Sequence, residues 1–187
     1  TIGGRLTLVG NPHQGKTLTL YRLMAAAQRT CRMCLTPIIH FIDDRNGKAE
    51  KTCRCGACDS MSATYFDIET EFDENWAGMH GVQLSAASDK FTEEMEGLHV
   101  APDAKFAICR LQTTEQAATM MEAIVEGGYC DFIGLDSIAA LNPYERKQGK
   151  KQPGDQARSI SRLTGALVSA QAAAWIDEGV APTFVAT

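Results

Sequence analysis

Short apolar runs alternate with segments of helical periodicity along this chain. Five runs are typical of buried strands, at 5–9, 64–69, 105–109, 129–137 and 182–187. Apolar side chains recur every three or four residues over 20–27 and again over 114–126. This alternation predicts an α/β fold in which helices flank a mostly parallel sheet.

Length and composition allow one well-cored domain with room for a small appendage. The 187 residues are 44% hydrophobic and 22% charged, which is ordinary for a soluble protein. No apolar run reaches the length of about 18 residues that a membrane-spanning helix needs, so we expect a cytoplasmic protein with no membrane partner. A net charge of −5 argues against a protein that coats nucleic acid indiscriminately. The chain begins at Thr1 without Met and stops within the run at 182–187, so we expect a fragment of a longer chain.

A glycine-rich segment lies between the first predicted strand and the first predicted helix. It follows the pattern G-x-x-x-x-G-K-T, and its members are Gly10, Asn11, Pro12, His13, Gln14, Gly15, Lys16 and Thr17, with Leu18 directly after them. Glycines let backbone N–H groups approach phosphates closely, and a helix N-terminus favours negative charge. In this pattern the lysine reaches the β- and γ-phosphates, and the hydroxyl ligates Mg²⁺. The segment predicts a P-loop that binds a nucleoside triphosphate with Mg²⁺.

Five of the seven cysteines lie between positions 31 and 58. The pairs Cys31-x2-Cys34 and Cys55-x2-Cys58 are separated by twenty residues, close to the spacing of two zinc knuckles. We therefore expect these four thiolates to bind Zn²⁺, with Cys53 or His40 as an alternative ligand for one of them. A disulfide or a redox-active C-x-x-C pair is the competing interpretation.

The segment around these cysteines resembles a small zinc ribbon. Residues 37–42 are typical of a strand, and Asn46-Gly47 is a hairpin turn signal. We expect an inserted zinc-binding subdomain over 31–62. Its role is open between a contact to DNA or a neighbouring subunit and simple local stabilisation. A four-thiolate site would be closed, so the metal would serve folding and not catalysis.

Two of the predicted strands end in carboxylates. The run at 64–69 ends at Glu69, and the run at 129–137 ends in Asp136 and Ser137. A strand buried on both sheet faces has a continuous apolar body, and a carboxylate at its carboxyl end can orient Mg²⁺-bound water. Downstream of a P-loop, the second run is typical of a Walker B strand.

Together these blocks resemble the RecA family of recombinases through almost the whole chain, 1–187, outside the cysteine insertion. The matching segments are 8–29, 66–73, 115–117, 136–141 and 154–159. The resemblance implies a P-loop NTPase core of RecA-like type that uses ATP and Mg²⁺. It further implies binding of single- and double-stranded DNA, helical filaments, and strand exchange coupled to ATP hydrolysis. The polar P-loop interior and the cysteine insertion depart from the family pattern, and a divergent viral or phage recombinase is a reasonable source for them.

The resemblance also assigns roles to individual residues. Glu69 would be the general base that activates the attacking water, with Lys16 on the phosphates. Trp76 would lie against the adenine and Asp73 would contact the base. Asp136 would act on the magnesium through a bound water, with Ser137 beside it. The alternatives are a core aromatic for Trp76 and a solvated strand-end carboxylate for Glu69.

Positive charge gathers after the last of these strands. The segment 142–162 holds six of the eighteen Lys and Arg residues, namely Arg146, Lys147, Lys150, Lys151, Arg158 and Arg162. It lies where the RecA family has its first DNA-binding loop, so the resemblance implies contacts to DNA phosphates and counterion release. A solvated charged loop is the alternative interpretation.

Two other functions fit parts of the sequence. A RecA-fold hexameric helicase shares the P-loop and the Walker B strand, but the segments at 66–73 and 154–159 favour a recombinase. A non-hydrolysing accessory protein that binds ATP and DNA is the third hypothesis. The presence of Lys16, Thr17, Glu69 and Asp136 argues against it.

Overall fold

A six-stranded sheet forms the centre of the computed structural model, which describes residues 4–45, 47–84, 98–99, 106–141, 155–178 and 182–187. The strand order is β1-β8-β7-β4-β6-β5, and every neighbouring pair is parallel except β5 with β6. The strands are β1 (Arg5–Thr7), β4 (Ala63–Asp67), β5 (Leu98–His99), β6 (Phe106–Arg110), β7 (Phe132–Asp136) and β8 (Thr183–Ala186). The prediction of an α/β fold with a mostly parallel sheet is confirmed.

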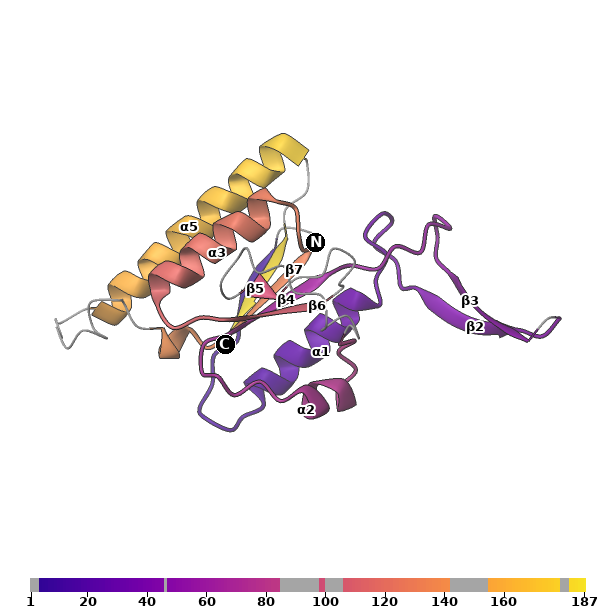
Figure 1. The fold of residues 1–187 in the computed structure, drawn as a ribbon, viewed down its shortest axis with the longest axis horizontal. Coiled ribbons are helices and arrows are strands. Elements are labelled where there is room, and N and C mark those ends of the chain that lie inside the picture. Colours follow the sequence, from indigo (N-terminus) through magenta and orange to yellow (C-terminus); the bar gives the residue numbers. More distant parts are fainter. Residues whose placement is uncertain (1–3, 46, 85–97, 100–105, 142–154, 179–181) are drawn as a thin grey trace.

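Helices cover both faces of this sheet (Figure 1). Helices α1 (Lys16–Gln28) and α2 (Glu74–Met79) lie on one face, and α3 (Thr114–Glu126) and α5 (Asp155–Glu178) lie side by side on the other. A short 3-10 helix, η1 (Ile138–Ala140), follows β7. The bounds predicted for α3 are those observed. This helix begins at a capping box, in which Thr113 and Gln116 bond each other's backbone N–H groups.

The central strands are buried on both faces, as their continuous apolar runs predict. On β4, Phe66 packs toward α3 and α5, whereas its neighbour Tyr65 packs toward α1 and α2. Helix α1 lies especially close to β7. A Cβ at Gly134 would come within 3.0 Å of Leu20 Cδ1 and 3.2 Å of Met24 Sδ, so glycine at this position permits the close approach.

Strand β4 ends earlier than the apolar run predicts. The run extends to Glu69, but the strand stops at Asp67, whose carboxylate accepts the backbone N–H groups of Glu71 at 3.0 Å and Phe72 at 3.3 Å. These two bonds turn the chain directly after the strand. Glu69 therefore lies in the turn and not on the sheet.

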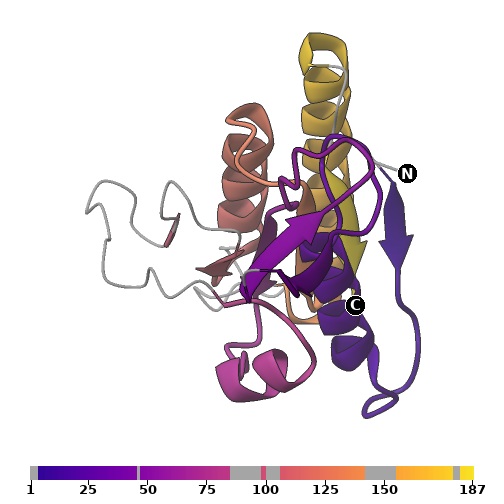
Figure 2. The ribbon, with the colours of Figure 1, turned by 90° about the vertical axis from the view of Figure 1, so that its right-hand side faces the viewer.

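The cysteine-containing segment forms an arm that projects away from the sheet (Figures 1 and 2). It carries an antiparallel pair of strands, β2 (Ile39–Asp43) and β3 (Lys48–Thr52), separate from the main sheet. The turn lies where Asn46-Gly47 predicts it, although residue 46 is outside the described residues. Gly47 has a positive φ of 67° and donates its N–H to Asp43 O at 2.8 Å.

Within the described ranges, no helix combines the length and the apolar character needed to span a membrane.

Candidate functional site

The carboxyl ends of β4, β7 and β8 meet at one edge of the sheet, beside the loop that leads into α1. Asp67 of β4 pairs in register with Asp136 of β7. Thr187 follows β8 at the same level, because Ala186 pairs with Leu135. Parallel strands bring their carboxyl ends to one edge, so residues far apart in sequence become neighbours here.

Asp136 is the centre of a hydrogen-bond network at this edge. Its Oδ2 accepts bonds from the Thr17 hydroxyl at 2.6 Å and from the Tyr65 hydroxyl at 3.0 Å. Its Oδ1 accepts a bond from the Thr187 hydroxyl. Three hydroxyl donors, from α1, β4 and the residue after β8, thus fix both carboxylate oxygens.

Glu69 is joined to the end of β7 through Ser137. The buried Ser137 hydroxyl donates to Glu69 Oε1, while the Glu69 side chain itself is exposed. One strand end therefore carries a fixed aspartate, and the neighbouring turn carries an exposed carboxylate held in position by a hydroxyl. This arrangement leaves a carboxylate that is open to solvent and held in one orientation, as a general base requires.

The loop before α1 is closed around the ammonium of Lys16. Lys16 Nζ donates to the carbonyl oxygens of Gly10 at 3.0 Å and Asn11 at 2.9 Å, which places positive charge inside the loop. Gly15 precedes the helix in the left-handed conformation with φ 78°, and His13 is exposed with φ 62°. Glycine is suited to the first of these positions because it has no Cβ to clash.

Gln14 gives the polar loop interior a structural role. Its side-chain oxygen accepts the Asn11 N–H at 3.0 Å and lies 2.9 Å from where a Cβ at Gly10 would stand. Pro12 contributes no N–H of its own. The side chain of Gln14 thus bridges the loop from within, and glycine at position 10 leaves space for it.

An aromatic cluster supports the network from the side of α1 and α2. The rings of Tyr21 and Tyr65 lie 5.6 Å apart, and burial raises the pKa of Tyr21 to about 12. Burial also raises the pKa of Tyr65 far above its usual range, and the nearby Asp136 charge adds to the effect. Both phenols therefore stay protonated and can act as donors at neutral pH.

Trp76 and Asp73 lie in this region as well. Trp76 is half-buried and packs edge-on against Tyr21, with ring centroids 5.3 Å apart. Asp73 caps α2 by accepting the Trp76 N–H at 2.9 Å. Their contacts to an adenine base stay predictions.

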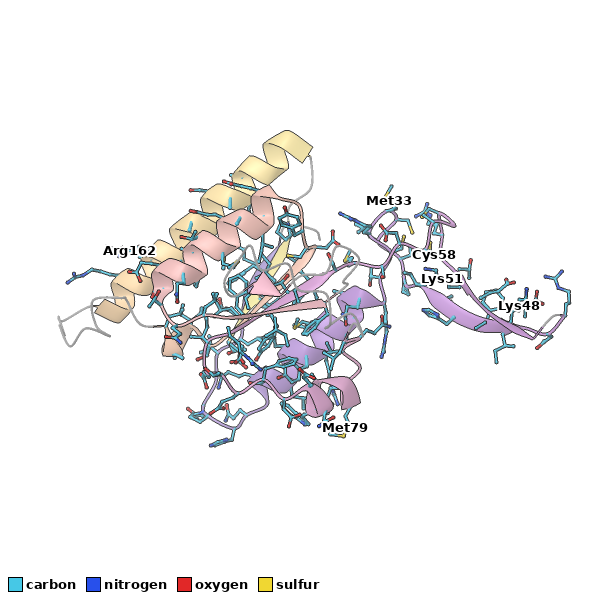
Figure 3. The ribbon with its side chains drawn as sticks, viewed as in Figure 1. Met33, Lys48, Lys51, Cys58, Met79 and Arg162 are labelled. Carbon is cyan, nitrogen blue, oxygen red and sulfur yellow. The ribbon has the colours of Figure 1, made fainter. Side chains whose placement is uncertain are left out.

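The predicted DNA-binding residues fall into two groups. Arg146, Lys147, Lys150 and Lys151 lie outside the described residues. Arg158 and Arg162 are exposed on α5, and Arg162 points away from the sheet (Figure 3). Arg162 Nη1 lies 3.0 Å from Glu115 Oε1 of α3, so this arginine also joins the two helices.

A cluster of cysteines lies at the root of the arm. The sulfur atoms of Cys31, Cys34, Cys53 and Cys55 lie within 4.8 Å of one another. This group differs from the set predicted by spacing, since Cys53, the alternative ligand, takes the place of Cys58. The prediction used only the number of residues between cysteines, whereas the turn after β3 determines which sulfur faces the others. In this turn Gly56 N–H donates to Cys53 O at 3.1 Å, and Cys58 N–H donates to Cys53 Sγ at 3.2 Å. His40 lies on β2, exposed and outside the group.

All seven cysteines belong to the described residues and are free thiols. The Thr36 hydroxyl, 3.0 Å from Cys34 Sγ, lowers the pKa of Cys34 to about 5. Cys109 and Cys130 are buried in the domain, and burial raises the pKa of both thiols. The low pKa of Cys34 favours thiolate chemistry at the root of the arm, whereas the two buried thiols belong to the core.

Sequence reasoning missed three residues that shape the site: Tyr65, Asp67 and Thr187. Tyr65 and Asp67 lie within an apolar strand, and the strand pattern does not show that the Tyr65 hydroxyl faces Asp136. Asp67 is an acidic residue at a strand end, which is the one signal that pointed toward this edge. Thr187 becomes visible only through the register of β8 with β7.

Comparison with known proteins finds partial similarity to RecA proteins, although no family model matches the chain. Protein RecA of Chloroherpeton thalassium is 30% identical over 112 residues, which cover 56% of this chain and 26% of that protein. The plasmid RecA of Lactococcus lactis subsp. lactis is 33% identical over 110 residues, covering 59% of this chain and 32% of that protein. RecA of Delftia acidovorans is 31% identical over 124 residues, covering 65% and 27%. The chain thus spans about a third or less of the length of these curated relatives. These distant, partial similarities support a RecA-like family.

Proposed function

We propose that this chain is the ATP-hydrolysing core of a RecA-like recombinase, which binds DNA and couples ATP hydrolysis to strand exchange. The observation that carries the proposal is the network at the carboxyl edge of the sheet. It joins Thr17, at the start of α1, to Asp136, at the end of β7, across 119 residues of sequence. The partial similarity to RecA proteins supports the same assignment.

In this proposal the loop 10–17, with Leu18 after it, holds the phosphates of ATP. The α1 N-terminus supplies backbone N–H groups, and Lys16 supplies a charge that already lies within the loop. Trp76 and Asp73 are the proposed contacts to the adenine. The 1–187 segment would act as one ATPase core, with 31–62 as an insertion in it.

The residues around Asp136 fit a magnesium ion. Thr17 Oγ1 and Asp136 Oδ2 lie 2.6 Å apart, and hard oxygen donors of this kind are the ligands that Mg²⁺ prefers. Thr17 would hold the ion directly, Asp136 would hold it through water, and Ser137 would lie beside them. Bound there, the ion would neutralise charge on the phosphates.

Glu69 is the proposed general base. Its exposed carboxylate can accept a proton from the attacking water while the Ser137 hydroxyl fixes its orientation. The Asp67 carboxylate fixes the turn that carries Glu69 by accepting two of its backbone N–H groups. A carboxylate already held in its reactive orientation lowers the activation barrier of hydrolysis, because fewer arrangements must be sampled.

DNA contacts are proposed for the basic residues after β7. Arg158 and Arg162 sit exposed on α5, near the N-terminal end of that helix. Together with Arg146, Lys147, Lys150 and Lys151 they would bind the phosphates of single-stranded DNA, and double-stranded DNA during exchange. A helical filament of this protein on DNA is part of the same proposal.

The test is ATP hydrolysis with and without single-stranded DNA, beside a strand-exchange assay on the full-length protein. Glu69→Gln should bind ATP normally but hydrolyse it roughly 10²–10⁴-fold more slowly, because a glutamine cannot accept the proton. Glu71→Gln is the matched control, since Glu71 is exposed two residues away and its side chain has no proposed role.

Each outcome of this assay bears on the proposal. Hydrolysis that rises with DNA, together with strand exchange, supports it. Unwinding without exchange would indicate a helicase instead. Hydrolysis by Glu69→Gln at the rate of the unmodified protein would overturn the role of Glu69, and no hydrolysis by any form would indicate an accessory protein.

A further inference from the structure

The cysteine cluster lies at the edge of the sheet opposite the candidate nucleotide site. Cys31 forms a β-bridge with Ser60, which lies just before β4. Arg32 Nη2 lies 3.3 Å from Asp131 Oδ1, and Asp131 directly precedes β7. The root of the arm therefore meets the amino ends of the same strands whose carboxyl ends carry Asp67 and Asp136.

The sulfur positions match those of a tetrahedral metal site. Cys55 Sγ lies 3.7 Å from Cys31 Sγ and 3.6 Å from Cys53 Sγ. A tetrahedron with Zn–S bonds of about 2.3 Å has sulfur atoms about 3.8 Å apart. A disulfide would need two of them within about 2.05 Å. The two distances match the edge of such a tetrahedron, and all four sulfurs lie within 4.8 Å of one another.

Backbone N–H groups point at the sulfurs, as they do around bound thiolates. Cys58 N–H donates to Cys53 Sγ at 3.2 Å, Thr36 N–H bonds Cys34, and Ala57 N–H bonds Cys55. Lys51 places its ammonium 3.0 Å from Cys58 O, at the base of the arm (Figure 3). Donors and a cation around the cluster offset the negative charge that four thiolates would bring.

The arm has almost no apolar core to hold it together. Its buried cluster consists of Cys31, Ile38 and Cys58, with Cys34 and Cys53 partly buried against them. Every described residue of β3 is exposed, and of β2 only Asp43 is buried. An isolated two-stranded hairpin is marginally stable in water, and small units of this kind usually depend on a metal or a disulfide.

We propose that Cys31, Cys34, Cys53 and Cys55 bind one Zn²⁺ ion that fixes the root of the β2–β3 arm to the amino-terminal edge of the sheet. Binding displaces the thiol protons that remain on the four cysteines, and those protons pass to solvent. Four protein ligands leave no open position, and the site lies far from Glu69 and Asp136. The ion is therefore structural, and its binding is independent of the function proposed for the opposite edge.

The test is the zinc content of the purified full-length protein and of two matched variants. We expect about one zinc per chain in the unmodified protein, the stoichiometry of a closed four-thiolate site. Cys53→Ala should lose most of this zinc, whereas Cys58→Ala should keep it. Cobalt substituted for zinc should give the strong sulfur-to-metal absorption of a tetrahedral thiolate site in the unmodified protein and in Cys58→Ala only.

Limited proteolysis gives a second measurement that does not depend on metal analysis. A strong chelator should make the arm, 39–52, susceptible to cleavage while the sheet domain stays intact. Loss of zinc in Cys58→Ala with retention in Cys53→Ala would overturn the ligand assignment in favour of the C-x2-C pairs. Iron in place of zinc, or a disulfide with no metal, would overturn the proposal itself.

Discussion

Replacing Asp67 by asparagine tests how the structure positions Glu69. The Asp67 side chain is 2% exposed, and its carboxylate accepts the N–H groups of Glu71 at 3.0 Å and Phe72 at 3.3 Å. Arg110 Nε lies 3.7 Å from the same group. An asparagine has one oxygen in place of two, so in either orientation one backbone N–H would face the amide NH₂ group.

The expected loss of stability follows from these contacts. A buried N–H left without an acceptor costs about 1–3 kcal/mol. The remaining bond changes from a charged to a neutral acceptor and loses about 1 kcal/mol. The Arg110 side chain is 59% exposed, so loss of its ion pair with Asp67 contributes at most about 0.5 kcal/mol. We expect Asp67→Asn to lower the free energy of unfolding by about 2–4 kcal/mol, a large share of the stability of an ordinary domain.

Urea unfolding followed by circular dichroism measures this loss. Glu71→Gln is the control because it removes one negative charge from an exposed side chain while keeping the backbone N–H, and it should change stability by less than about 0.5 kcal/mol. ATP hydrolysis by Asp67→Asn should also fall at a temperature where the variant is folded, since the turn carrying Glu69 is no longer held. A loss of stability below about 0.5 kcal/mol would refute the role of Asp67.

Two further predictions concern the packing of α1 on the sheet and the buried phenols. Gly134→Ala should lower the free energy of unfolding by about 1–3 kcal/mol, because its Cβ would meet Leu20 and Met24 at 3.0 and 3.2 Å. Gly165→Ala on α5 should instead raise the free energy of unfolding by up to about 1 kcal/mol, since no atom lies within 4 Å of the new Cβ. Equal changes in the free energy of unfolding for the two variants, measured by urea titration, would contradict the close packing at Gly134. Alkaline pH should also destabilise the protein, because burial raises the pKa of Tyr21 from 10.0 to about 12 in the folded state. The protonated Tyr21 contributes fully to the free energy of unfolding below pH 10, and this contribution is lost as pH rises through 12. Phenolate absorbance from all four tyrosines, rising at the ordinary pKa of tyrosine before the loss of circular dichroism, would contradict this burial.

The elements could be predicted from the sequence where local signals agree. Helix α3 was predicted with its observed bounds because its apolar face has a clear period, and the structure adds a capping box at its start. Strand β4 was predicted to end two residues too late because an apolar run cannot show that Asp67 turns the chain. Helix α2 was not predicted, since six residues are too few to show a helical repeat of apolar positions.

The cysteines show the same division. Their clustering in the sequence predicted a metal site, since the C-x2-C pairs and the intervening hairpin signal are local features. Which sulfurs face one another depends on the turn after β3, where Gly56 takes a positive φ of 76° and Cys53, Cys55 and Cys58 lie within six residues. The spacing favoured Cys58 with Cys53 as an alternative, and the observed cluster contains Cys53, because spacing along the chain says nothing about the direction of a side chain.

The sequence by itself determined the alternating α/β pattern, the glycine-rich loop before α1, and the carboxylates that end two strands. These follow from short-range chemistry: period, turn residues and charge at strand ends. Only the tertiary structure decided that Thr17, Tyr65 and Thr187 converge on Asp136 and that Ser137 holds Glu69. Strand order and register make those contacts, and both depend on which strands pair across the sheet, which no local pattern in one chain specifies.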